Sequence, residues 1–448
     1  MKRIECFAGN LIFLFLFSLL TFSCKQKTIS VHDENNIFRK TNAPVFVQVH
    51  LNKNEISAEK NGRLALIDPT NDNSFPVQLE ISEHGENTGL IFMFPEKISK
   101  ANEFKLVENK SAFNSALTAA VDTASGQIVV KEDGKKVLQY NYQTVYEKDV
   151  IRRENDKNEP LVFPEMSGVY FEEYLKSHPE YKKDTVVTGS IYSVPRSDYI
   201  HPLFGLEGEM LTNDWPDGGH PHHRGIFWAW PEVEYGKERG DIYALQRVFA
   251  RPTGNIEYLC GSVFAQIDAE NLWMWEDNEP IVKENAIIRI YHSTTTSRII
   301  DLTIKLQALK DSVTIATRFT NSYGGLNIRM QTPENQNISF FTDRKGSDPL
   351  RAWSDFNGIF EGNKSTSGLM VLQHKDNPEY PGEWKEYPEL AWVQPTFPTP
   401  NTRYLLSKEV PLILRYRLII HSGGKQNEDY YMKNWDAYHS ILTPFKID

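Results

Sequence analysis

The chain has 448 residues, of which 40% are hydrophobic and 24% are charged, and its net charge is −10. This composition is that of an ordinary folded protein, and the length exceeds what one hydrophobic core usually spans, so we expect two domains. The negative charge argues against nucleic acid as a partner, because nucleic-acid binding requires a basic surface.

The first residues, 1–24, have the pattern of a bacterial lipoprotein signal peptide. Lys2 and Arg3 precede an apolar run that is short for a bilayer span and ends just before Cys24. Cleavage there makes Cys24 the lipid-carrying residue, followed by a flexible polar tether at 25–42. We expect the protein in the periplasm or at the cell surface, with the N-terminal lipid anchor as its one membrane contact. A signal without lipid and an uncleaved anchor are the alternatives.

The three cysteines leave no disulfide in the processed chain. Cys6 is removed with the signal and Cys24 carries the lipid, so Cys260 has no partner. We expect Cys260 to be a small buried hydrophobe.

Strand-like runs dominate the first third of the chain. Four short runs predict a small N-terminal β domain over 43–125, at 45–51, 63–67, 77–81 and 90–94. The pair Asp133-Gly134 then separates two further runs and predicts a hairpin, because it supplies the positive φ angles of a type I′ turn. A larger domain is expected from 126 to 448.

One polar segment, 147–185, is rich in charged residues and Asn. We interpret it as a surface insertion or a lid on the larger domain. Helical patterns are scarce, and the best short candidate, Val169–Leu175, lies within this insertion.

Two later segments alternate apolar and polar residues as half-buried strands do. The first, Ile300–Ala308, is followed by a turn and by the run Val313–Phe319, which together predict an antiparallel hairpin. The second, Leu412–Ile420, carries Arg415 and Arg417 on its other face, with His421 next to them. We predict an all-β fold, an antiparallel β-sandwich with a smaller N-terminal β domain.

Histidines mark the candidate site. Four of the twelve lie between His201 and His223, and the block from His220 to Gly225 reads His-Pro-His-His-Arg-Gly. Imidazoles exchange protons near neutral pH and hydrogen-bond in two directions. In an extended chain His220 and His222 would point to one side and His223 to the other.

Three interpretations of the histidine block remain open. Neutral histidines can donate and accept protons toward a sugar, with Arg224 neutralising a carboxylate or an oxyanion. A His-x-His pair can instead hold a metal ion, although no cofactor is otherwise expected. The third is a hydrogen-bonded turn with half-buried imidazoles.

Aromatic residues make up 12% of the chain, with nine Trp. Flat rings with a polar handle suit the faces of sugars, although Trp also fills sandwich cores. We expect Trp228 to lie beneath the ligand and Trp384 to contact it from a later loop.

Two further segments contribute candidate residues. Gly324-Gly325 allows a close approach or bulge, after which Arg329 projects into a cleft. Glu334 is the nearest carboxylate and is the candidate general base. His374 lies in a Pro-rich polar loop and is assigned to the same cleft.

Several common motifs are absent from the sequence. The chain has no Walker loop, no Gly-x-Ser-x-Gly elbow and no His-Glu-x-x-His. Nucleotide use, serine-hydrolase chemistry and zincin proteolysis are therefore disfavoured.

The segment from Lys136 to His421 resembles the family named PmoA ("methane oxygenase PmoA"), whose function is not known. The His-Pro-His-His-Arg-Gly block carries most of the likeness, with support from His201-Pro202, Gly324-Gly325 and the strand ending at His421. The methane oxygenase activity of the name does not fit, because it needs several membrane-spanning helices.

The resemblance implies a secreted protein of carbohydrate-degrading bacteria. The fold also looks similar to galactose-mutarotase-like sandwiches, which act on sugars with histidines and a carboxylate. We expect a carbohydrate-active enzyme with His220, His222, His223 and Glu334 as acid–base residues. Ligand contacts are assigned to His201, Arg224, Trp228, Arg329, His374 and Trp384. A non-catalytic glycan-binding lipoprotein and a metal-dependent enzyme are the alternatives, and a small saccharide or glycan is the expected partner.

Overall fold

The computed structural model describes residues 27–31, 33, 36–81, 87–95, 101–113, 116–145, 195–215, 220, 222–343 and 350–440. The predicted signal peptide with Cys24, the 147–185 insertion and the helix expected at Val169–Leu175 lie outside these residues. In the described ranges, no helix combines the length and apolar character needed to cross a membrane.

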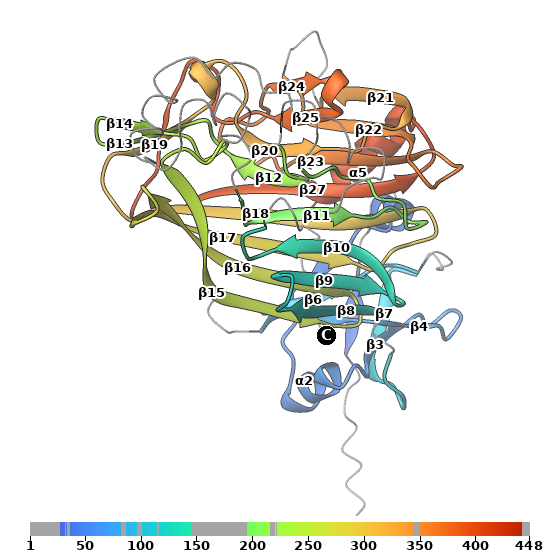
Figure 1. The fold of residues 1–448 in the computed structure, drawn as a ribbon. Coiled ribbons are helices and arrows are strands. Elements are labelled where there is room, and N and C mark those ends of the chain that lie inside the picture. Colours follow the sequence, from blue (N-terminus) through green and yellow to red (C-terminus); the bar gives the residue numbers. More distant parts are fainter. Residues whose placement is uncertain are drawn as a thin grey trace, which may run out of the picture.

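Two antiparallel eight-stranded sheets form the body of the molecule, as Figure 1 shows, which confirms the all-β expectation. The first sheet has the order β24-β25-β20-β12-β11-β10-β9-β8. Its strands in chain order are β8 (Leu117–Asp122), β9 (Gln127–Glu132), β10 (Lys135–Asn141), β11 (Tyr199–Leu203), β12 (Ile226–Ala229), β20 (Gly325–Arg329), β24 (Trp384–Tyr387) and β25 (Trp392–Pro395).

The second sheet has the order β15-β16-β17-β18-β27-β23-β22-β21. Its strands are β15 (Val248–Cys260), β16 (Phe264–Trp275), β17 (Glu279–Tyr291), β18 (Ser297–Ala308), β21 (Glu334–Phe341), β22 (Trp353–Ile359), β23 (Ser367–Gln373) and β27 (Leu412–Ser422).

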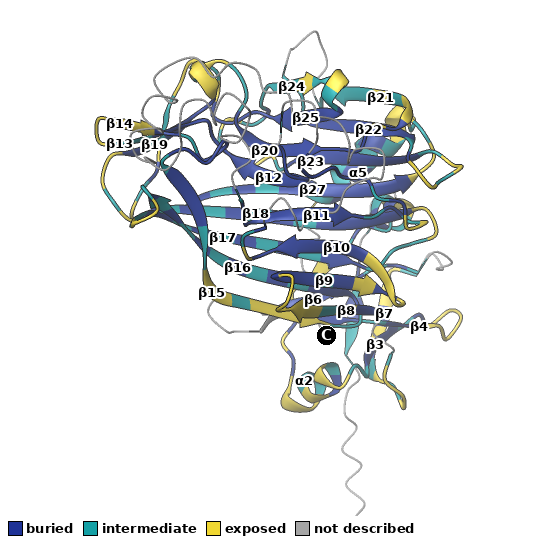
Figure 2. Ribbon diagram, viewed as in Figure 1, coloured by how far each residue is buried: buried dark blue, intermediate teal, exposed yellow. Residues whose placement is uncertain are grey.

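The alternation read from the sequence places the main core between these sheets. Ile300 to Ala308 in β18 and Leu412 to Ile420 in β27 each bury every second side chain there. Figure 2 shows most strands of the two sheets buried along their centres, whereas loops and the second half of β15 are exposed. Each fully buried Leu or Ile contributes roughly 1.5–3 kcal/mol, so this two-residue period accounts for the stacking of the sheets.

Three smaller sheets complete the fold. One lies beside the candidate site and contains β13 (Glu232–Tyr235), β14 (Glu238–Gly240), β19 (Val313–Ala316) and β26 (Tyr404–Leu405). The other two are N-terminal and contain β1 (Thr28–Ser30), β2 (Val45–Val47), β3 (Leu64–Ile67), β4 (Ser74–Pro76), β5 (Gln78–Ile81), β6 (Asn87–Phe92) and β7 (Glu103–Glu108). Among the described residues, the helices are α1 (Ile37–Thr41), α2 (Lys53–Lys60) and α5 (Glu428–His439), with 3-10 turns η5 (Arg318–Thr320) and η6 (Pro388–Leu390).

A second core covers the outer face of the second sheet. It joins the N-terminal strands and α5 to residues such as Trp353 and Met370. The N-terminal segment and α5 therefore cover one outer face of the sandwich, that of the second sheet. The other outer face is that of the first sheet.

Two local hairpin predictions had opposite outcomes. The Asp133-Gly134 hairpin is confirmed, because Glu132 of β9 pairs with Lys135 of β10 and both turn residues have positive φ. The hairpin of 300–308 with Val313–Phe319 is wrong. β18 pairs with β17 and β27, whereas β19 pairs with β13 and β26 in another sheet. A turn in the sequence predicts that the chain changes direction, but it does not predict which strand the next strand pairs with.

Two expectations for the chain termini and cysteines also need correction. The described part of the 25–42 tether is folded, because Ile29 in β1 pairs with Phe104 in β7 and α1 follows. Cys260 is exposed, because it ends β15 where that strand forms the sheet edge. The proposed domain division stays a prediction. β8, which lies before the proposed boundary at residue 126, pairs with β9, which lies after it.

Candidate functional site

A tight turn holds the histidine block beside the first sheet. The His223 N–H donates to the His220 carbonyl at 3.0 Å, which closes the turn. Two more backbone hydrogen bonds fix the segment that follows the turn. The Gly225 N–H donates to Asn213 O at 2.7 Å, and the Arg329 N–H of β20 donates to Gly225 O at 2.8 Å. Gly225 is required here, since its φ is +50° and a Cβ would lie 2.2 Å from the Ile200 carbonyl.

The turn brings all three imidazoles together. Ring centroids of His222 and His223 are 4.7 Å apart, and His220 lies 5.0 Å from His223 and 5.8 Å from His222. The expectation that His223 would point away is therefore wrong, because it assumed an extended chain and the chain turns between His220 and His223.

Aromatic side chains from distant segments line the histidines. Tyr243 lies 5.6 Å from His222 and 5.9 Å from His223, and Trp392 stacks on His223 at 6.1 Å. Tyr323 connects the two, at 5.0 Å from Tyr243 and 6.0 Å from Trp392. We call His220, His222, His223, Tyr243, Tyr323 and Trp392 the histidine–aromatic cluster.

Strand register places this cluster on the outer face of the first sheet. Trp228 points inward, because its indole N–H donates to Glu284 of β17 at 2.7 Å. Its neighbour Phe227 therefore points outward, and its ring lies 5.1 Å from Tyr243. Arg329 of β20 pairs with Trp392 of β25 on the same outward side.

The electrostatic surroundings keep His222 and His223 neutral. Burial and the neighbouring His220 lower the pKa of His222 well below its usual value, and the positive charges of Arg196 and Arg318 act in the same direction. Burial, His222 and Arg329 likewise lower the pKa of His223. At neutral pH both rings therefore carry one protonated and one unprotonated nitrogen, as a base or a hydrogen-bond acceptor requires.

Asp241 is the carboxyl group that the sequence analysis missed. Burial raises its pKa to about 7, and its electrostatic partners include Arg318 and Arg196. No sequence signal marks Asp241, which follows β14 in a connection whose position depends on the tertiary fold. The predicted base Glu334 is exposed at the start of β21, and no described contact joins it to the cluster.

The raised pKa of Asp241 predicts a defined pH dependence of stability. The folded state holds the proton more tightly than the unfolded state, so the stabilising contribution is complete below about pH 4 and is lost as the pH rises through about 7. We expect Asp241→Asn, which stays neutral, to lose less melting temperature than the parent between pH 5 and pH 8. Thermal unfolding across this range is the measurement, and parallel curves for the two proteins would contradict the prediction.

Several polar atoms of the cluster are buried with no hydrogen-bond partner among the described residues. They are His223 Nδ1, the Tyr243 hydroxyl and Trp392 Nε1. Each such atom costs about 1–3 kcal/mol when it is left unpaired, so their meeting in one place indicates a site for a polar molecule.

Three predicted ligand contacts instead hold the site's walls. Arg224 is fully buried, lies over the Trp215 ring at 3.3 Å and pairs with Asp214 at 3.5 Å. His201 is buried in β11, where its Nδ1 lies 3.0 Å from the Thr212 hydroxyl. Trp228 belongs to the core between the sheets. The contacts described for these three residues are with other parts of the fold and are structural.

Two other predicted contacts lie elsewhere. His374 is packed against α5, with its ring 4.9 Å from both Tyr438 and His439, on the covered side of the second sheet. Trp384 points into the edge of the main core, where its N–H donates to Arg351 O at 2.9 Å. Neither residue has a described contact with the histidine–aromatic cluster.

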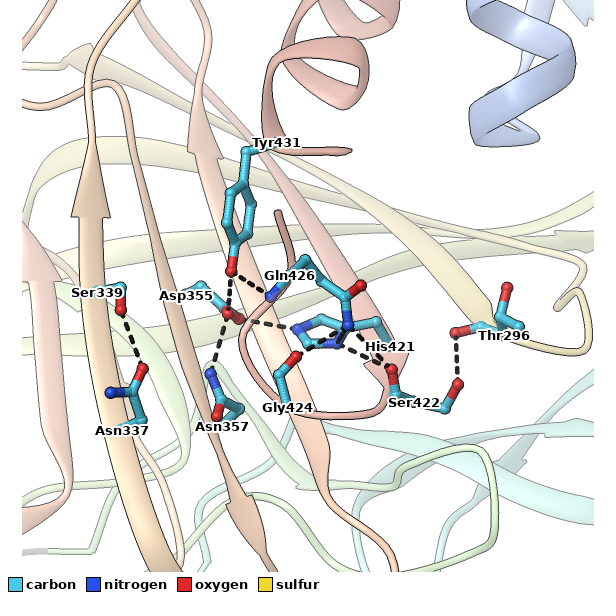
Figure 3. Close-up of polar contacts among 10 residues, drawn as sticks. All are labelled: Thr296, Asn337, Ser339, Asp355, Asn357, His421, Ser422, Gly424, Gln426 and Tyr431. Atoms are coloured by element: carbon cyan, nitrogen blue, oxygen red, sulfur yellow. Dashed lines mark hydrogen bonds and ion pairs between the residues drawn. The ribbon is translucent and has the colours of Figure 1, made fainter. Parts of the chain in front are cut away.

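The polar face of β27 is paired rather than open. Arg417 donates twice to Asp301, at 2.7 and 2.8 Å. Figure 3 shows His421 beside Asp355, 2.8 Å away, and the Tyr431 hydroxyl donating to the same carboxylate at 2.6 Å. The bond from Tyr431 to Asp355 fastens α5 to the second sheet.

The metal interpretation requires several possible ligand side chains to lie close together. Within the described ranges, no three or more His, Cys, Asp or Glu side chains are grouped so that they could hold a metal ion. The three imidazoles of the histidine–aromatic cluster therefore do not form a group of this kind.

Comparison with known proteins gives a family and no function. No curated protein matches the chain. A model of a family of unknown function, DUF6807, matches residues 183–434 and so includes the histidine turn, Asp241 and the cluster aromatics. This match overturns the resemblance to the PmoA family and to the sandwiches compared with it. Because the match covers more than half of the sequence, the chain belongs to the DUF6807 family.

Proposed function

We propose that the protein is a carbohydrate-active enzyme that uses the histidine–aromatic cluster for acid–base chemistry on a saccharide or glycoside. The observation that carries this proposal is the group of unpaired buried polar atoms among aromatic rings, on His223, Tyr243 and Trp392. A sugar presents hydroxyl groups at its edge and apolar C–H groups on its faces, so both kinds of wall are complementary to it.

Roles follow from protonation states. His222 and His223 are neutral at pH 7 and suit the removal of a proton from a hydroxyl group. Asp241, with a pKa of about 7, is protonated in a large fraction of molecules and suits the return of a proton. Arg329, whose charge lowers the pKa of His223, would stabilise negative charge on a sugar oxygen.

A second candidate is a glycan-binding protein without catalysis. It is favoured by the depth of the site, because His223 is only 4% exposed and a base must reach the atom it deprotonates. The same cluster would then serve recognition alone. The predicted lipid anchor and an extracytoplasmic location fit both candidates.

Two measurements on the purified protein test the proposal. Calorimetry with neutral and acidic saccharides should show binding, and chromatography of the same mixtures should show a product. Binding without product selects the glycan-binding candidate. If no saccharide binds, the carbohydrate proposal is wrong.

A further inference from the structure

The loop Arg318–Tyr323 borders the histidine–aromatic cluster and carries an exposed phenylalanine. Tyr323 is a member of the cluster, and Arg318 donates a hydrogen bond to its hydroxyl. The Arg318 guanidinium also lies over the Phe319 ring, 5.0 Å from the centroid. Phe319 is therefore separated from the cluster by one side chain.

Phe319 is the most exposed aromatic residue in the described part of the chain. Its side chain is 63% exposed, compared with 46% for Tyr258 and 40% for Phe46, the other aromatic residues that are strongly exposed in the described part of the chain. A single exposed hydrophobe is common on protein surfaces, so exposure by itself does not indicate a function.

The backbone under this ring is strained. Phe319 has a φ of +52° and Thr320 a φ of +59°, which is the left-handed region that bulky and β-branched residues avoid. Two consecutive residues of this kind cost on the order of 1–3 kcal/mol each.

Hydrogen bonds on both sides maintain this conformation. Arg318 N–H donates to Tyr323 O at 2.8 Å, and Ser322 N–H donates to Arg318 O at 3.0 Å. Asn401 N–H, from a separate loop, donates to the Thr320 carbonyl. The loop is thus held in a costly shape that presents an apolar ring to solvent next to a polar site.

We propose that Phe319 forms an outer stacking subsite for a second sugar ring, so that the substrate is an oligosaccharide or a longer glycan. This inference rests on the proposed function. Arg318 lies over one face of the ring, and the sugar would stack on the opposite face, while the preceding unit of the same chain occupies the cluster. A fixed ring loses little entropy on binding, which explains why the strained loop favours recognition.

Calorimetry with a ladder of oligosaccharides from one to four units, in the gluco, xylo and manno series, tests this inference. In the parent protein we expect affinity to increase from one unit to two. Phe319→Ala should remove that increase, a loss of about threefold to tenfold for two units or more, and leave the monosaccharide affinity unchanged. Phe319→Trp should retain the increase.

Val410→Ala is the matched control, because Val410 is 69% exposed and lies outside this loop. It should change neither affinity. An unchanged increase in Phe319→Ala, or an equal loss for every length, would overturn the stacking subsite. The proposed function fails separately, when no saccharide binds the parent protein or when His222→Gln leaves saccharide turnover intact.

Discussion

Replacing His222 by Gln is expected to reduce turnover of a saccharide substrate by about 10²- to 10⁴-fold, the usual contribution of a general acid or base. The side chain is half-buried and lies against His223 and Tyr243. Gln keeps hydrogen-bonding capacity but cannot exchange a proton near neutral pH, so the chemistry is lost and the fold is kept. Initial rates by product chromatography, with melting temperatures in parallel, measure the effect.

One carboxylate variant and one histidine variant serve as controls for this result. Glu334→Gln and His374→Gln change residues that the sequence analysis also selected, and the structure places both away from the cluster. We expect either variant to keep activity within about twofold of the parent. A large fall in the melting temperature of His222→Gln together with its loss of rate would favour a structural role for the histidine turn. A larger loss of rate in Glu334→Gln would do the same.

Replacing Asp355 by Ala is expected to have the largest effect on stability. The buried carboxylate accepts hydrogen bonds from the Tyr431 hydroxyl at 2.6 Å and the Asn357 amide at 3.0 Å, and it pairs with His421. Removing it takes away the shared partner of three buried side chains between α5 and the second sheet. We expect a loss of about 3–5 kcal/mol in the free energy of unfolding, measured by urea denaturation.

Tyr431→Phe serves as the control for this prediction. It removes one hydroxyl and leaves His421 and Asn357 with their partner, so a loss of about 1 kcal/mol is expected. The His–Asp–Tyr arrangement in Figure 3 looks like a catalytic relay, but all three side chains are at most 2% exposed. An Asp355→Ala variant that stayed as stable as the parent and lost saccharide turnover would contradict the structural role.

The sequence predicted the parts of the fold that depend on local periodicity. The alternation in β18 and β27 identified their buried faces, and the Asp133-Gly134 pair identified its hairpin. The partner of β19 was missed, because a short apolar run is compatible with several neighbouring strands. Partner choice depends on contacts between residues that are far apart in sequence.

The sequence identified only the part of the candidate site whose residues are close together in the chain. The histidine block was visible because its members are adjacent in sequence, whereas Asp241 and Tyr243 come from the connection after β14 and carry no motif. Tyr323 directly precedes the Gly324-Gly325 pair, which was a usable signal. His374 was assigned to the site because it lies in a Pro-rich polar loop. It directly follows β23, and this position places it beside α5.

A crystal structure with a bound oligosaccharide tests the central claim most directly. We predict one sugar ring against His222, Tyr243 and Tyr323, with hydroxyl groups within hydrogen-bond distance of His223 Nδ1 or the Tyr243 hydroxyl. A saccharide that binds in another place, such as the 470 Å³ cavity lined by Arg417 and Tyr438, and leaves the histidines untouched would contradict it.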